Sequence, residues 1–86
     1  MQFKMISVYD AKAAVYSPPI CVPTLGIAER SFTDEVNNPQ SQYNKHPEDY
    51  TLFHVGDYDD NTGKTVNLET PYSLGVALVF KKTDAS

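Results

Sequence analysis

Cysteine, glycine and tryptophan are scarce in this 86-residue sequence, which has one Cys, four Gly and no Trp. With the single cysteine Cys21, the chain has no intrachain disulfide, whereas a secreted domain of this size normally carries several. Because Cys21 lies in the apolar run 20–22, we expect a buried and unreactive thiol. The glycines form neither a GxGxxG nor a GxxxxGK pattern, and no serine lies in a GxSxG context. The sequence therefore offers no phosphate-cradling loop and no nucleophile elbow.

Long apolar runs are also missing. No stretch approaches the ~20 residues that a membrane span needs. The first ten residues, MQFKMISVYD, lack the basic segment followed by an apolar segment that marks a signal peptide. We therefore expect a cytoplasmic protein without membrane contact.

Positive charge is in short supply, with seven Lys and Arg against eleven Asp and Glu and a net charge of −4. Broad, charge-driven binding to nucleic acid or anionic lipid rests on neutralising phosphates, so this balance argues against it. A localised basic patch remains compatible with the composition.

Apolar and aromatic residues are present in sufficient number for a core. Hydrophobic residues make up 41% of the chain, and six Tyr and four Phe are among them. A chain of this length buries only roughly 60–65% of the surface that its unfolded form exposes. We therefore predict one domain over residues 1–86, with a thin core that favours a homo-oligomer.

The pattern of apolar residues predicts strands over 2–9, 14–16, 50–55, 64–68 and 73–80. One helix is predicted in the run LGIAERSFTDEVNN, with Thr24 as its N-cap. Within it, Leu25, Ala28, Phe32 and Val36 form one apolar stripe. Residues 39–48 are expected to form an irregular loop, and Pro71 to end a strand.

The order β-β-α-β-β-β predicts an α+β fold, a single antiparallel sheet of about five strands with one helix packed on one face. The other face would be uncovered, which favours dimerisation.

Metal and catalytic sites are poorly supported. Asp57, Asp59 and Asn61 match the start of an EF-hand loop, but Thr62 and Leu68 stand where Gly and Glu are needed, so a solvated hairpin turn is favoured. His46 and His54 are too few for a zinc site. The run 46–49 sets an imidazole beside two carboxylates, but a polar loop does not by itself supply the pocket that acid–base catalysis requires. We predict no metal, no cofactor and no enzymatic activity.

Lysines interleaved with aromatic residues are what remains. Aromatic rings stack on bases while cations hold phosphates, which is how proteins bind single-stranded nucleic acid. The alternative is that these lysines are solubility charges and protect the sheet edges. Lys81 and Lys82 would adjoin Lys4 if the first and last strands pair. The candidate nucleic-acid-binding residues are Lys4, Lys12, Tyr16, Tyr43, Lys45, His46, Lys81 and Lys82.

Four blocks of the chain, in this order, resemble the small nonstructural protein of gokushoviruses, which are microviruses with circular single-stranded DNA. The blocks are SVYDAKAAVYSPP, RSFTDEVNN, NKHPEDYTLFHVGDYDDNTG and SLGVALVFKK. The resemblance implies a DNA-binding or DNA-synthesis protein in the cytoplasm of the infected bacterium. It would be the counterpart of the microvirus C protein, which favours viral single-strand synthesis and packaging. No binding motif is transferred with the resemblance.

Two functions therefore stay open. In the first, the protein binds single-stranded viral DNA through a local patch, with a shallow salt dependence from about two to four phosphate contacts. In the second, it is an adaptor that docks on the replication initiator or the procapsid through its uncovered sheet face or a free strand edge.

Overall fold

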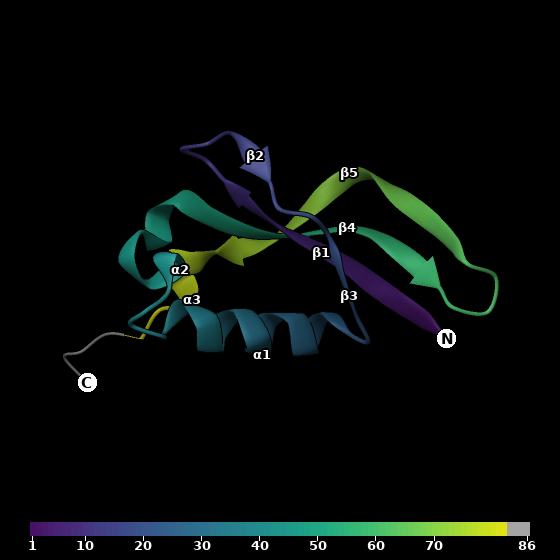
Figure 1. The fold of residues 1–86 in the computed structure, drawn as a ribbon, viewed down its shortest axis with the longest axis horizontal. Coiled ribbons are helices and arrows are strands. Elements are labelled where there is room, and N and C mark those ends of the chain that lie inside the picture. The colour runs from purple at the N-terminus through teal and green to yellow at the C-terminus, as the bar shows by residue number, and fades with distance from the viewer. Residues whose placement is uncertain (83–86) are drawn as a thin grey trace.

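The computed structural model of the protein describes residues 1–82 and has the α+β architecture expected from the sequence (Figure 1). Its elements follow in the order β1 (Gln2–Asp10), β2 (Val15–Tyr16), β3 (Ile20–Val22), α1 (Leu25–Val36), α2 (Gln42–Lys45), the 3₁₀ turn η1 (Pro47–Asp49), β4 (Tyr50–Asp59), β5 (Lys64–Val76) and α3 (Ala77–Phe80). None of the described helices is long and apolar enough to cross a membrane.

The five strands form one antiparallel sheet in the order β2-β1-β4-β5, and β3 also pairs with β1. Because β4 occupies the other side of β1, β2 and β3 follow one another along the same edge. The strand predicted over 14–16 is confirmed as β2, which pairs antiparallel with β1.

Ser17 joins β2 to β3 where Pro18 and Pro19 interrupt the edge. Prolines have no N–H to donate to a ladder. The Ser17 N–H donates to the Val8 carbonyl at 2.8 Å, and the Val8 N–H donates to Ser17 Oγ at 2.9 Å. The Ser7 hydroxyl in turn donates to the Ser17 carbonyl at 2.7 Å. One serine thus keeps the edge attached to β1 between the two short strands.

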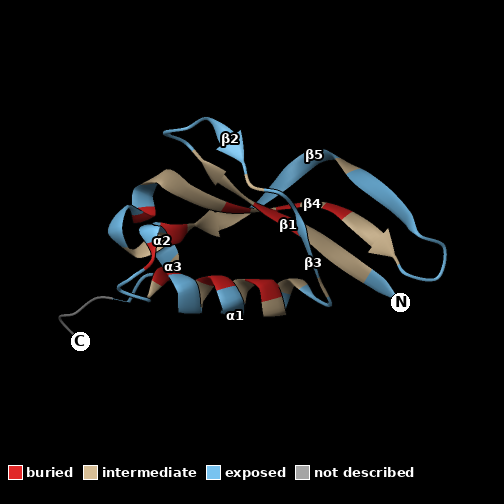
Figure 2. Ribbon diagram, in the orientation of Figure 1, coloured by how far each residue is buried: buried red, intermediate tan, exposed pale blue. Residues whose placement is uncertain are grey.

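Helix α1 covers one face of the sheet, and the core lies between them (Figure 2). Thr24 caps the helix as predicted, because its Oγ1 accepts from the Ile27 N–H at 3.1 Å. The predicted stripe is confirmed, with its last three residues buried and Leu25 half-buried. The buried apolar residues are Ile6, Ala28, Phe32, Val36, Leu52 and Ala77.

The prediction of two separate strands at 64–68 and 73–80 is wrong. Strand β5 runs without a break through Pro71, because residues 68–71 lie between the paired residues Asn67 and Tyr72 and oppose only Val55. The missing proline N–H therefore removes no ladder bond. The strand ends at Val76, and residues 77–80 form α3.

Gly75 and Phe80 explain why the last apolar run turns into a helix. Gly75 has a φ of +136°, which side-chain-bearing residues rarely adopt, and a Cβ there would lie 2.9 Å from Phe80 Cε2. The chain thereby folds back and sets the Phe80 ring edge-on against Phe32, with ring centroids 5.5 Å apart.

Three smaller expectations also need correction. Helix α1 ends at Val36, two residues before the expected end at 38. The segment expected to be an irregular loop contains α2 and η1. Cys21 is exposed, because it lies on the short edge strand β3 and pairs with Met5, on the side of β1 opposite to buried Ile6.

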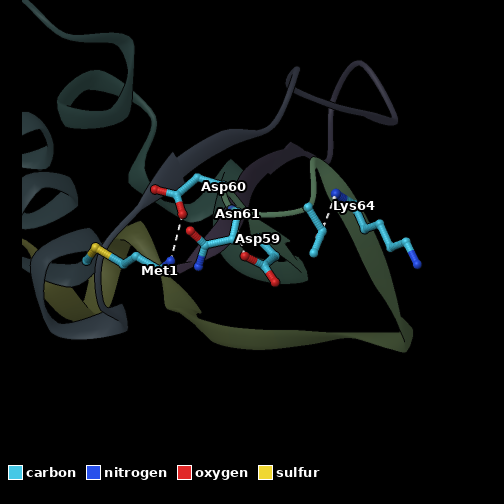
Figure 3. Close-up of polar contacts among 6 residues, drawn as sticks. Met1, Asp59, Asp60, Asn61 and Lys64 are labelled. Atoms are coloured by element: carbon cyan, nitrogen blue, oxygen red, sulfur yellow. Dashed lines mark hydrogen bonds and ion pairs between the residues drawn. The ribbon is translucent and has the colours of Figure 1, made fainter.

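The hairpin of β4 and β5 and the start of β1 extend past the amino-terminal end of α1 (Figure 1). We call this part of the sheet, residues 2–5, 56–59 and 64–67, the arm. Its turn is held by local bonds (Figure 3): the Met1 amino group lies 2.6 Å from Asp60 Oδ1, and the Asn61 N–H donates to Asp59 Oδ1 at 2.9 Å. The predicted hairpin turn is thus confirmed.

Candidate nucleic-acid interface

The two faces of the sheet can be assigned residue by residue, because side chains alternate along a strand and paired residues share a face. Ile6 and Leu52 are buried against α1. The residues paired with them across neighbouring strands, which we call a row, therefore also point their side chains toward the helix. We call this side the helix face and the opposite side the outer face.

An irregularity near Val55 shifts the register between the body of the sheet and the arm. Across it, His54 Nε2 lies 3.1 Å from Asp57 Oδ1, and Lys4 Nζ lies 3.4 Å from the same carboxylate. His54 is paired with Ile6 and therefore lies on the helix face. Because Asp57 contacts His54, and Lys4 contacts Asp57, these two residues also lie on the helix face. The outer rows are therefore Phe3–Tyr58–Thr65, Cys21–Met5–Gly56–Asn67, Ser7–Phe53–Ser73 and Tyr16–Tyr9–Thr51–Val76.

Three aromatic rings from three strands gather on the body of the outer face. The Tyr9 and Tyr16 ring centroids are 4.7 Å apart, and Tyr16 and Phe53 meet edge-on at 5.4 Å. Tyr9 and Phe53 complete the triangle at 6.5 Å. Tyr16 is 44% exposed, so the group presents a ring to solvent. We call Tyr9, Tyr16 and Phe53 the aromatic cluster.

A second aromatic pair lies on the arm. Phe3 and Tyr58 are directly paired across β1 and β4, and their ring centroids are 6.3 Å apart. Both residues are half-buried. We call them the arm pair.

Charge is distributed unequally between the two faces. The paired charged residues of the described strands all lie on the helix face: Lys4, Asp10, Asp57, Asp59 and Lys64. On β5, alternation between Asn67 and Tyr72 places the exposed, unpaired Glu69 on the outer side. The acidic residues of α1 lie on that side of the sheet too. Glu69 apart, the acidic residues of the strands therefore lie off the outer face.

Two of the eight sequence-predicted residues lie at the aromatic cluster. Tyr16 is a member of it. Lys12 is exposed in the turn that joins β1 to β2, beyond the Asp10–Val15 pair that follows the row of Tyr9 and Tyr16. This turn is held by Asp10, whose Oδ1 accepts from the Lys12 N–H at 3.0 Å.

Tyr43, Lys45 and His46 do not join them. The Tyr43 ring packs inward against Phe32 at 5.3 Å and Tyr50 at 4.8 Å, and burial raises the pKa of the Tyr43 hydroxyl. Lys45 ends α2 and is exposed.

His46 lies in an anionic setting. Its ring offers a ligand atom within 4.8 Å of one each from Glu48 and Asp49. Such a group favours a cation over a phosphate. The absence of a metal site stays a prediction.

The expected grouping of Lys4 with Lys81 and Lys82 is wrong, because β5 pairs with β4 and not with β1. Lys4 is paired with Asp57 on the helix face. Lys81 Nζ donates to the Asn44 carbonyl at 3.0 Å, and the Lys82 N–H donates to Asn37 Oδ1 at 2.8 Å. Both lysines thus lie beside the carboxyl end of α1, where the helix dipole disfavours an anion.

Sequence reasoning missed Phe3, Tyr9, Phe53 and Tyr58 as site residues. Their signal was the alternation that puts Phe3 and Tyr9 on one side of β1. What was missing was the register that aligns them with β4.

Comparison with known proteins agrees with a viral origin. The model of the family described as Phage ORF5 protein matches residues 3–80, nearly the whole chain. Neither the curated proteins nor the solved structures contain a significant match. The chain belongs to the Phage ORF5 protein family.

Proposed function

We propose that this phage protein is non-enzymatic and binds single-stranded DNA by stacking bases on the aromatic cluster of its outer face. The observation that carries the proposal is a sheet face on which three aromatic rings meet and whose paired residues are uncharged. With the gokushovirus resemblance, it favours a role in viral single-strand synthesis or packaging in the cytoplasm of the infected host.

Stacking suits this face because every base has an aromatic surface, so rings bind bases with little regard to sequence. Bases in a duplex are already stacked on each other and are not available in this way. The protein should therefore prefer single strands to duplex.

Phosphate contacts contribute little in this arrangement. Lys12 is the only one of the predicted cations that lies beside the aromatic cluster in the described structure. With one or two phosphates neutralised, log K should fall with log salt at a slope of about −0.7 to −1.4. This is shallower than the two to four contacts expected from the sequence.

Fluorescence anisotropy of a labelled oligo-dT strand tests the proposal. Tyr16→Ala should weaken binding by about 1–3 kcal/mol, the usual contribution of one stacked base. Tyr72→Ala is the matched control, because Tyr72 is 62% exposed but lies in the row of His54 on the helix face. Lys12→Glu should weaken binding, and Lys64→Glu, on the helix face, should not.

Equal losses in Tyr16→Ala and Tyr72→Ala would show that the outer face is not the binding surface. Flat anisotropy with the wild-type protein at high concentration would rule out direct DNA binding altogether.

A groove between α1 and the β1–β3 edge favours adaptor function as the second candidate. It has a volume of about 160 Å³, and Ile6, Val8 and Ile20 line it opposite Phe32 of α1. Ile20 is 60% exposed, which suits contact with an apolar side chain of a partner protein. In that case Ile20→Asp would abolish binding of the purified replication initiator or capsid protein and leave oligo-dT binding unchanged.

A further inference from the structure

We propose that the arm pair, Phe3 and Tyr58, is a second base-stacking station, and that one DNA strand runs along the outer face from the aromatic cluster to the arm. This inference rests on the proposed function, because the first station is the cluster already described. It adds a second set of binding residues and a path for the strand.

Both stations lie on the same face and share strands β1 and β4. From Tyr9 to Phe3 is six residues along β1, or about 20 Å at the rise of a strand. A single strand that keeps its bases stacked advances about 3.4 Å per nucleotide, so about six nucleotides span this distance. A shorter oligonucleotide reaches only one station.

The surface between the stations is suited to a strand lying close to it. The row there is Cys21–Met5–Gly56–Asn67, which has no charged member. Gly56 has no side chain, so nothing projects from the middle of this row. A Cβ at this position would lie 2.7 Å from the Val66 carbonyl oxygen. No carboxylate lies in this row; Glu69 is two residues beyond its end at Asn67 on β5.

The arm is held in place without the ligand. Beyond the strand ladders, the Asp60 N–H donates to the Met1 carbonyl at 3.1 Å, and the Gly63 N–H donates to the Asp59 carbonyl at 2.8 Å. The start of β1 is thus fixed to the hairpin turn, and the second station does not have to be ordered by binding.

Cys21 offers a direct report on the path. Its thiol is exposed, it is the only cysteine, and its row lies between the two stations. A strand that spans both stations must pass this row. Bound DNA should therefore slow alkylation of Cys21 by N-ethylmaleimide.

The experiment compares dT3 with dT10 on the full chain. We expect dT10 to bind more tightly than dT3. Tyr58→Ala should weaken the affinity for dT10 by about 5- to 150-fold and leave the affinity for dT3 unchanged. Tyr58→Phe, which keeps the ring, should bind like wild type, and Tyr72→Ala is again the control. In the wild-type protein dT10, but not dT3, should protect Cys21 from N-ethylmaleimide.

The outcomes separate the two proposals. Binding of dT10 that is unaffected by Tyr58→Ala, or that leaves Cys21 unprotected, would overturn the second station and leave the aromatic cluster as the whole site. Failure of both oligonucleotides to bind would overturn the proposed function itself. The Cys21 measurement uses the wild-type protein, so it decides the question even if Tyr58→Ala does not fold.

Discussion

Replacing Ser17 with alanine tests how the outer edge of the sheet is held together. Its hydroxyl oxygen accepts from the Val8 N–H at 2.9 Å, at the point where two prolines prevent an ordinary ladder. Ser17→Ala removes this acceptor and leaves the donor on half-buried Val8 without its partner. The Ser17 backbone bonds to Val8 and Ser7 do not depend on the side chain and remain.

The expected cost follows from those contacts. The bond from the Val8 N–H is lost together with the longer 3.3 Å contact between Ser7 Oγ and Ser17 Oγ. One hydrogen bond is worth about 0.5–1.5 kcal/mol, and an unsatisfied buried donor costs about 1–3 kcal/mol. Because the position is at the sheet edge, water replaces part of the lost bond, and we expect about 1–2 kcal/mol in the free energy of unfolding. In a domain of this size, each kcal/mol lost from the free energy of unfolding lowers Tm by about 4–8 °C.

Urea denaturation followed by circular dichroism measures this change, with Ser31→Ala on the exposed surface of α1 as the matched control. Ser17→Ala should unfold at lower urea with the same m-value. Since Ser17 follows Tyr16 directly, oligo-dT affinity should fall as well. Identical midpoints for Ser17→Ala, Ser31→Ala and wild type would refute the idea that this hydroxyl replaces a ladder bond.

Two further predictions concern the end of the molecule near α3. Gly75→Ala should destabilise the fold by about 2–5 kcal/mol. A φ of +136° is strained for alanine, and the new Cβ would displace the Phe80 ring. An unchanged Tm of this variant would contradict the prediction. The pKa of Tyr43 is raised by burial and then by its neighbour Tyr50, so the unfolded chain loses this proton first as pH rises. The contribution of Tyr43 to stability should therefore be constant below pH ~10 and fall above it. The loss of stability above pH ~10 should be less steep in Tyr43→Phe, as thermal melts across this range would show.

Much of the fold was predictable because local patterns and tertiary structure agree. The stripe of Ala28, Phe32 and Val36 specifies a helix with one buried side, and the structure buries all three. Strands β1 and β4 carry apolar residues on both faces, as central strands do. These elements need no knowledge of distant residues.

The errors arose where a distant contact decides the local structure. An apolar run such as 77–80 fits a strand or a helix equally well, and it becomes α3 because Phe80 packs over Gly75 and against Phe32. Pro71 is compatible with a strand only because the residues around it are out of register with β4. Neither fact can be read from neighbouring residues.

The candidate site was the hardest part to predict for the same reason. Tyr9 and Phe53 are 44 positions apart in the sequence, and whether they share a face depends on the pairing of β1 with β4. A shift of one residue would turn Phe53 toward α1. The lysines were chosen by composition, and composition carries no information about which side of the sheet a charge occupies.

The side on which charge lies also removes the main objection to DNA binding by an acidic protein. Electrostatic repulsion depends on distance and on salt, with a Debye length of about 8 Å at physiological ionic strength. The carboxylates of α1 are separated from the outer face by the core and the sheet, a thickness of about 10 Å. DNA stacked on the outer face would thus be separated from the three carboxylates of α1, while the rings of Tyr9, Tyr16 and Phe53 act at contact distance. An acidic chain can therefore bind a polyanion, provided that the bases and not the phosphates supply most of the affinity.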